Sequence, residues 1–89
     1  MNTKKEVVQW CEANGIAISI EKWEGAVNHV HLDIDAPHKV FRSVGTHNLA
    51  VWDSLDPIDW RAVGKEIVLA DFGECTDPAC EYCYEVTAL

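Results

Sequence analysis

Basic residues are scarce in this chain of 89 residues. Seven Lys and Arg stand against fifteen Asp and Glu, which gives a formal net charge of −8 at pH 7. Such a charge repels the phosphate backbone that supplies most nucleic-acid affinity, so direct binding of DNA or RNA is disfavoured. A basic protein surface is attracted instead, because opposite potentials raise encounter rates. We therefore expect another protein with a basic surface as partner; the alternative is that the charge serves only solubility.

Long hydrophobic runs are also missing. The apolar stretches IAISI and NLAVW fall far short of the roughly 20 residues of a membrane span. The N-terminal stretch MNTKKEVVQWCEANG has a helical pattern and lacks the apolar core of a secretory signal. We therefore expect a soluble, cytoplasmic protein, and in that compartment cysteines serve first as metal ligands or plain reduced thiols.

The usual catalytic signatures are absent as well. The sequence has no nucleotide-binding glycine loop, no G-x-S-x-G elbow and no H-E-x-x-H motif. Those motifs mark nucleotide binding, serine hydrolases and zinc proteases, respectively. An enzyme is therefore not the favoured interpretation.

Two segments have the period of amphipathic helices. The first covers about residues 4 to 14 and begins with a capping box formed by Thr3 and Glu6. The second is expected to begin with Asp56 as its cap and Pro57 at its first position, and to continue to about residue 71. Its core-facing stripe consists of Trp60, Val63, Ile67 and Ala70.

The segments between these helices alternate in the manner of half-buried strands. IAISIEKW and VNHVHLDID flank the WEGA turn and predict an antiparallel hairpin, and KVFRSV and HNLAVW predict a third and a fourth strand. The chain thus predicts one domain, 1–89, in which 74–89 form a cysteine-bearing C-terminal tail. Its fold class is α+β: a small antiparallel sheet of three to four strands with two helices packed on one face, in the order α-β-β-β-(β)-α.

Packing of this core is expected to involve both large and small side chains. Trp10, Trp23, Trp52 and Trp60 are expected to anchor the core or its rim, although a row of tryptophans is also suited to stacking on bases or sugars. Gly64, in the middle of the second helix, is expected to allow a close contact between helix and sheet.

Three of the four cysteines lie in the segment CTDPACEYC. The C-x2-C pair formed by Cys80 and Cys83 can bind one tetrahedral Zn²⁺, and Cys75 is close enough in sequence to be a third ligand. The fourth ligand would be Cys11, a histidine such as His47, or water. Acidic neighbours raise thiol pKa values and disfavour a reactive cysteine. A structural zinc site, inert reduced thiols, and a disulfide or redox pair remain as alternatives.

The segment HVHLDID provides a second candidate metal site. On a strand, His29, His31 and Asp33 project to the same side, and these residue types can hold a catalytic metal, with His47 as a further ligand. The favoured alternative is that they form the polar, solvent-facing side of an antiparallel strand.

The segments DAPHKVFRSVGTHNL, DPIDW and CTDPACEYC resemble a loose group of small uncharacterised proteins from phages and other mobile elements. In that group an F…G.H strand motif precedes a helix and a C-terminal cysteine cluster. The resemblance covers roughly residues 35 to 83, implies a mobile-element origin and carries no established activity. The matching positions are Phe41, Gly45, His47, Cys75, Cys80 and Cys83.

Charge, missing catalytic motifs and the cysteine tail together favour a small acidic protein-interaction module with an optional structural zinc. A more specific form of this hypothesis is that the chain is an acidic inhibitor of a nucleic-acid-handling host protein. Anti-CRISPR and anti-restriction proteins of similar size and acidity act in this way. A second alternative is a small metal-dependent enzyme that uses the His-x-His-x-Asp strand. The terminal segment YEVTAL, as an edge strand, would favour a homodimer.

Overall fold

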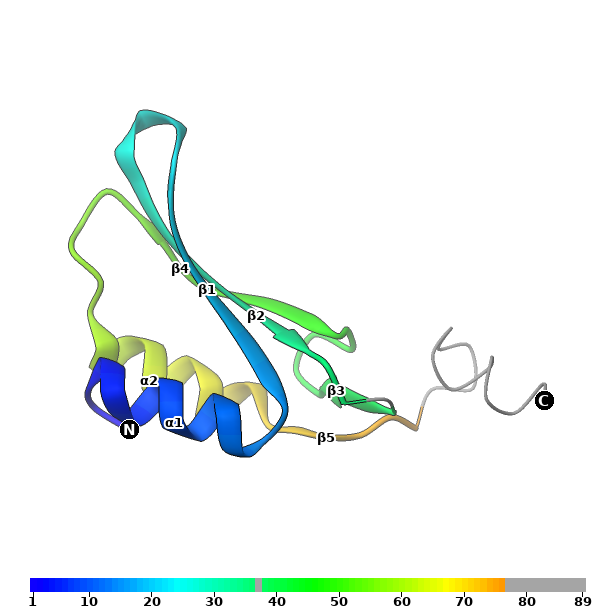
Figure 1. Cartoon of the computed structure of the whole chain (residues 1–89). Helices are drawn as coiled ribbons and strands as arrows, with labels where there is room; N and C mark the ends of the chain where they lie inside the picture. The colour runs from blue at the N-terminus through cyan, green and yellow to red at the C-terminus, as the bar shows by residue number, and fades with distance from the viewer. Residues whose placement is uncertain (37, 77–89) are drawn as a thin grey trace.

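The computed structural model describes residues 1–36 and 38–76 (Figure 1). This part of the chain confirms the predicted α+β class and the order α-β-β-β-β-α, to which a short final strand is added. The elements are α1 (Lys4–Ala13), β1 (Ile16–Trp23), the 3-10 turn η1 (Glu24–Ala26), β2 (Val27–Ile34), β3 (Lys39–Phe41), β4 (Asn48–Ser54), α2 (Trp60–Ala70) and β5 (Phe72–Glu74).

The main sheet has three antiparallel strands in the order β1-β2-β4. The hairpin register pairs Ile16 with Ile34 and Trp23 with Val27. The pairing of β2 with β4 shifts between Val30 and His31. The predicted hairpin and fourth strand are therefore confirmed.

The segment KVFRSV does not continue the meander, in contrast to the prediction. Only its first three residues form a strand, β3, which pairs with β5 in a separate two-stranded sheet. The reason lies in the chain after α2: Phe72 pairs with Phe41, and Glu74 pairs with Lys39. The segment that forms β5, Phe72–Glu74, is too short for its alternation to predict a strand, so the sequence does not predict a partner for β3.

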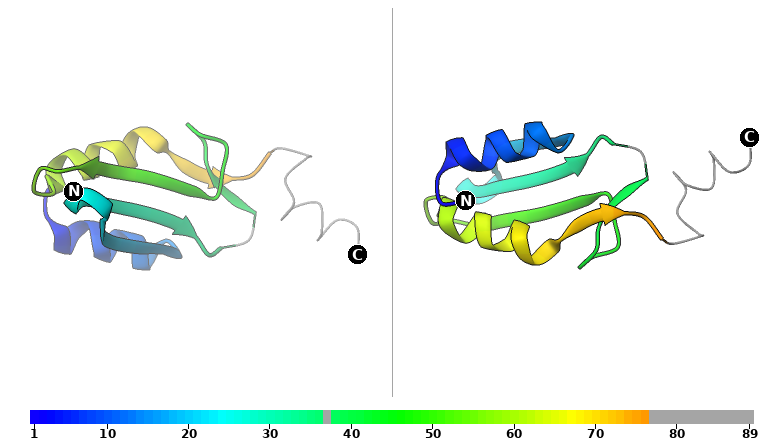
Figure 2. Two further views of the ribbon diagram at one scale, coloured as in Figure 1. Left: turned by 90° about the horizontal axis from the view of Figure 1, so that it is seen from above. Right: turned by 90° about the horizontal axis from the view of Figure 1, so that it is seen from below.

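Both helices lie on one face of the main sheet, as predicted (Figure 2). They bury an apolar core against that face, and Trp10, Trp52 and Trp60 pack at its margin. Trp23 is the exception among the tryptophans, because it is half exposed. The core residues are Val7, Cys11, Ile16, Val30, Leu32, Ile34, Phe41, Val51, Val63, Ile67 and Ala70.

The capping box of α1 is present. The Oγ1 of Thr3 accepts a hydrogen bond from the Glu6 backbone N–H at 3.2 Å. The Glu6 carboxylate accepts in return from the backbone N–H of Asn2 and from the Thr3 hydroxyl, and these bonds lower the pKa of that carboxyl. Neither of the two described helices has the length and apolar character that a membrane crossing requires.

The second helix begins later than predicted. Its N-cap is Asp59, whose Oδ1 accepts from the backbone N–H groups of Arg61 at 3.1 Å and Ala62 at 3.3 Å. The expected cap, Asp56, instead accepts a hydrogen bond at its backbone carbonyl from Asn28 Nδ2 at 2.7 Å. The loop is thus tied to the end of the sheet, and the helix starts only at the next carboxylate.

Gly64 permits a close contact, but with a different partner from the one expected. A Cβ at this buried position would overlap the backbone carbonyl oxygen of Met1, so the N-terminal residue lies directly against α2. The prediction of a helix–sheet contact is therefore wrong. Sequence periodicity gives no information about where the residues before the first helix are placed.

Candidate functional site

The face of the main sheet opposite the helices carries no further layer in the described part of the chain (Figure 2). Residues that pair across antiparallel strands project to the same side, so the register identifies the side chains of this face. We call this surface the open face. It consists of Ala17, Ser19, Glu21 and Trp23 from β1, Val27, His29, His31 and Asp33 from β2, and Asn48, Ala50 and Asp53 from β4.

The predicted constellation of His29, His31 and Asp33 lies together on the open face. The two imidazole rings are 5.7 Å apart between centroids, with an angle of 23° between their planes. The Nε2 of His31 lies 3.3 Å from the Oδ1 of Asp33. The expectation of a solvent-facing row is nevertheless wrong for His29, which is only 3% exposed.

Trp23 covers one side of the His29 ring. The indole stacks on the imidazole with 3.6 Å between ring centroids and 18° between planes. The indole N–H donates a hydrogen bond of 2.7 Å to the Oε2 of Glu21. Trp23 therefore covers one side of His29 while 49% of its own surface stays exposed.

Sequence reasoning missed this arrangement, although a signal for it exists. Glu21 pairs directly with His29, and Trp23 pairs with Val27, so Trp23 is a diagonal neighbour of His29 across the hairpin. Diagonal pairs lie within reach of an aromatic side chain. The register of the hairpin, set by the turn between its strands, was the missing information.

The ring nitrogens of His29 lack hydrogen bonds to the described residues. The nearest carboxylate oxygen, Oδ1 of Asp53, lies 3.7 Å from Nδ1, beyond hydrogen-bond distance. A buried polar group without a partner costs about 1–3 kcal/mol. His29 thus occupies its position at the expense of stability.

The predicted zinc site is only partly covered by the structure. Cys80, Cys83 and the segment YEVTAL lie outside the described residues, so the site and the edge strand remain predictions. In residues 1–36 and 38–76 no group of three or more His, Cys, Asp or Glu side chains is arranged to hold a metal ion. Cys75 is half buried, and its backbone N–H donates to the His38 carbonyl at 2.7 Å.

The two named candidates for a fourth zinc ligand have different surroundings. Cys11 lies in the apolar core, and burial raises the pKa of its thiol to about 11. His47 is half buried, and its Nδ1 lies 2.7 Å from the Lys39 carbonyl oxygen. His47 and Cys75 therefore approach the neighbouring residues 38 and 39, whereas Cys11 belongs to the helical layer.

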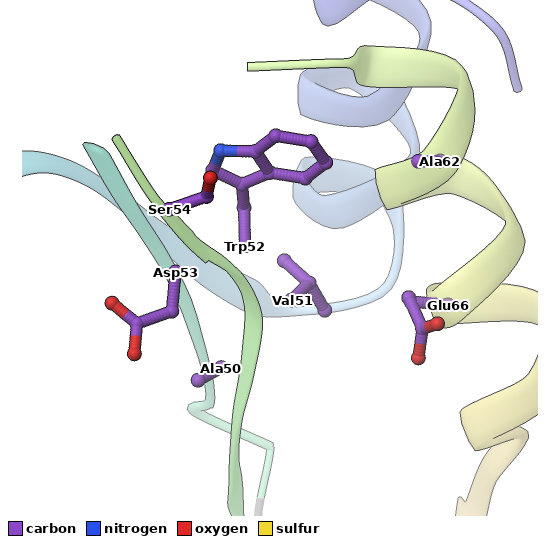
Figure 3. Close-up of a pocket in the computed structure, with 7 residues that line it drawn as sticks. All are labelled: Ala50, Val51, Trp52, Asp53, Ser54, Ala62 and Glu66. Carbon is purple, nitrogen blue, oxygen red and sulfur yellow. The ribbon is translucent and has the colours of Figure 1, made fainter. Parts of the chain in front are cut away.

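An open groove of about 330 Å³ runs between β4 and α2 (Figure 3). Val51 points into it toward α2, whereas Asp53 points to the opposite side of the strand. This orientation agrees with the placement of Asp53 on the open face. The groove is lined by Ala50, Val51, Trp52, Asp53, Ser54, Ala62 and Glu66.

No protein-family model, curated protein or solved structure matches this chain. The mobile-element origin accordingly stays a prediction. The chemistry of the open face is that of three carboxylates, one exposed indole and a buried imidazole beneath it.

Proposed function

We propose that this chain is a small acidic protein-interaction module whose open face binds a basic surface of another protein. One observation carries the proposal: the open face contains Glu21, Asp33 and Asp53 and no Lys or Arg. The side chains of Asp33 and Asp53 are 52% and 62% exposed, so a partner can reach them. Such a surface attracts cations and repels phosphate.

The basic residues of the described chain lie elsewhere. Lys4 and Lys5 belong to α1, and Arg61 and Lys65 belong to α2. Lys22 falls on the alternate side of β1, between the open-face residues Glu21 and Trp23.

Two further basic residues are already paired with acids. The Nζ of Lys39 lies 2.6 Å from Oε1 of Glu74, an interaction that lowers the pKa of the Glu74 carboxyl. Arg42 lies 3.6 Å from Asp71. Since all of these basic residues lie away from the open face, none of them neutralises the negative potential of that face.

The open face favours binding over metal-dependent catalysis. The enzyme hypothesis needs His29, His31 and Asp33 around one ion. Both nitrogens of His29 are buried, and Trp23 is stacked on the ring, so the imidazole is not presented to a substrate. Among the described residues, no group of three His, Cys, Asp or Glu side chains is arranged to hold one ion, and this includes His29, His31 and Asp33.

The test of the proposal is to map where a cationic probe binds. A heptalysine peptide should shift the backbone NMR signals of β1, β2 and β4 more than those of α1 and α2. The double variant Asp33→Asn/Asp53→Asn should bind the peptide about fivefold more weakly, since each exposed ion pair contributes about 0.2–1 kcal/mol.

The matched control is Glu12→Gln/Glu66→Gln, which changes the net charge equally but on the helices. If both double variants weaken binding to the same extent, only net charge matters and the open face is not the binding surface. The same conclusion follows if the shifts cluster on the helices.

The inhibitor version is supported by the same surface, because a one-sided row of carboxylates competes with phosphates for a basic groove. Its test is displacement of fluorescent duplex DNA from basic DNA-binding proteins of the native host. Displacement should weaken with salt and with Asp33→Asn/Asp53→Asn. DNA that stays bound at saturating concentrations of the wild-type chain would rule out this version for those proteins.

A further inference from the structure

Trp23 differs from the other exposed apolar side chains of the described chain in being held by specific contacts. It lies at the end of β1, beside the turn that closes the hairpin. One side of its indole is stacked on His29 at 3.6 Å, and 49% of the residue is exposed. Because stacking covers one side of a planar ring, the exposed area includes the opposite side.

The orientation of this indole is fixed before any partner arrives. The hydrogen bond of 2.7 Å to Glu21 holds the pyrrole edge, and the stack with His29 holds the plane. A side chain that is already ordered loses little conformational entropy on binding, so the cost of immobilising it is largely avoided. Trp23 is therefore a rigid platform within an acidic surface.

The chemistry around the platform selects a planar cation. A carboxylate has about four acceptor positions, and the indole N–H occupies one of those on Glu21. A guanidinium can stack on the exposed side of an indole and donate hydrogen bonds to a carboxylate at its edge. An ammonium group lacks the planar shape that makes both contacts at once.

We infer that Trp23 and Glu21 bind an arginine side chain of the basic partner, an inference that rests on the proposed function of the open face. Asp53 adds negative charge next to His29, 3.7 Å from its Nδ1. The arginine is thus recognised by an indole face and a carboxylate, while Asp33 and Asp53 contribute general attraction.

Two probe peptides of equal charge test this inference: heptaarginine and heptalysine. The wild-type chain should bind heptaarginine about three- to fivefold more tightly, as expected for one cation–π contact at an exposed site. Heptaarginine should also shift the indole N–H NMR signal of Trp23, which is assigned by its loss in Trp23→Leu. Both Trp23→Leu and Glu21→Gln should reduce the preference for arginine, and Trp23→Leu should abolish it.

The control is Leu69→Ala, which removes another exposed apolar side chain, 72% exposed, from α2 and should leave the preference unchanged. Dispersed amide signals would verify that each variant is folded. Glu21→Gln supplies an independent test if Trp23→Leu unfolds, because Glu21 is exposed.

The outcomes separate the two proposals. Equal affinity for both peptides, located on the open face, would overturn the arginine site and leave the proposed function standing. Binding of neither peptide to the open face would overturn both. A Trp23 signal that responds to an oligothymidylate but not to heptaarginine would overturn the arginine site and indicate stacking on bases instead.

Discussion

The two faces of the three-stranded sheet are built from neighbouring residues of the same strands, yet they differ in almost every property. In β2, Leu32 is fully buried against the helical layer, while the adjacent Asp33 is exposed on the open face. The covered face is apolar where the helices pack on it. The open face carries three carboxylates, and its one deeply buried polar side chain, His29, is covered by Trp23.

This difference agrees with the proposed division between a face that stabilises the domain and a face that binds a partner. The covered face supplies the hydrophobic burial that an 89-residue chain needs. The open face bears costs instead: an exposed indole, like charges on one surface and an imidazole whose nitrogens lack partners. Departures of this kind from optimal packing are expected at functional sites, and they motivate the proposed binding role of the open face.

The sharpest test of the comparison replaces neighbouring residues on opposite faces. Leu32→Ala should lower the free energy of unfolding by about 2–5 kcal/mol, because it leaves a cavity in the core. Asp33→Asn should change it by less than about 0.5 kcal/mol, because the side chain is largely solvated. Urea unfolding followed by circular dichroism measures both. Similar losses in the two variants would mean that the open face contributes to stability as the covered face does.

A pH titration probes burial on the covered side. Burial raises the pKa of Cys11 from 9.0 to about 11, so between these values the unfolded chain binds fewer protons than the folded chain. Stability should be unaffected by this thiol below pH 9 and should fall above it, by at most about 1.4 kcal/mol per pH unit. Urea unfolding between pH 8 and about 10.5 tests this in a background with the other cysteines changed to Ser.

Cys11→Ala in the same background should remove the Cys11 part of that slope. An unchanged slope would show that the thiol titrates as readily in the folded protein as in the unfolded one. Other groups that titrate in this range are common to both variants and cancel in the comparison.

Gly64→Ala tests the contact between the N-terminus and the helical layer. In the full chain the new Cβ would overlap the Met1 carbonyl oxygen, so a net loss of about 1–2 kcal/mol is expected. In a chain that starts at Asn2 the same change should stabilise by about 1 kcal/mol, because alanine is the better helix former. Thermal unfolding is measured for four proteins: the full chain and the chain that starts at Asn2, each with and without Gly64→Ala. The difference between the two effects of Gly64→Ala is the energetic coupling between Met1 and position 64. If Gly64→Ala changes stability in the same direction in both chains, Met1 moves aside for the new methyl group at little cost.

The smallest effect is expected on the open face. His29→Phe keeps an aromatic ring beneath Trp23 and removes two buried nitrogens without partners, so it should stabilise by about 1 kcal/mol. His31→Phe is the matched control, because His31 is less buried and contacts Asp33; it should change stability little. The denaturant midpoints of the two variants, each compared with that of the wild type, measure both effects. A loss of stability in His29→Phe would indicate that the imidazole makes a favourable interaction with Asp53.

Much of the fold followed from local rules. The capping box at Thr3 placed the first helix, and alternation in β1 and β2 placed the hairpin and its two faces. The start of α2 was misplaced because Asp56 and Asp59 are both good caps. The structure shows how the segment containing Asp56 is held, because the Asp56 carbonyl accepts hydrogen bonds from Asn28 Nδ2 and from the indole N–H of Trp52.

The candidate site was predicted less completely. Alternation placed His29, His31 and Asp33 on one side of a strand, and the structure agrees. Burial of His29 could not be derived from its own strand, because the side chain that covers it comes from the opposite strand of the hairpin. The pairing of β3 with β5 was missed for a similar reason, since it joins residues more than thirty positions apart.

The sequence by itself therefore determined the acidic charge, the helices, the hairpin and which residues of each strand share a face, because these depend on composition and on the fixed periods of helix and strand. Tertiary structure alone decided that Met1 lies on Gly64, that β5 pairs with β3 and that Trp23 covers His29. Those contacts depend on register and on the relative position of distant segments, which no local period specifies.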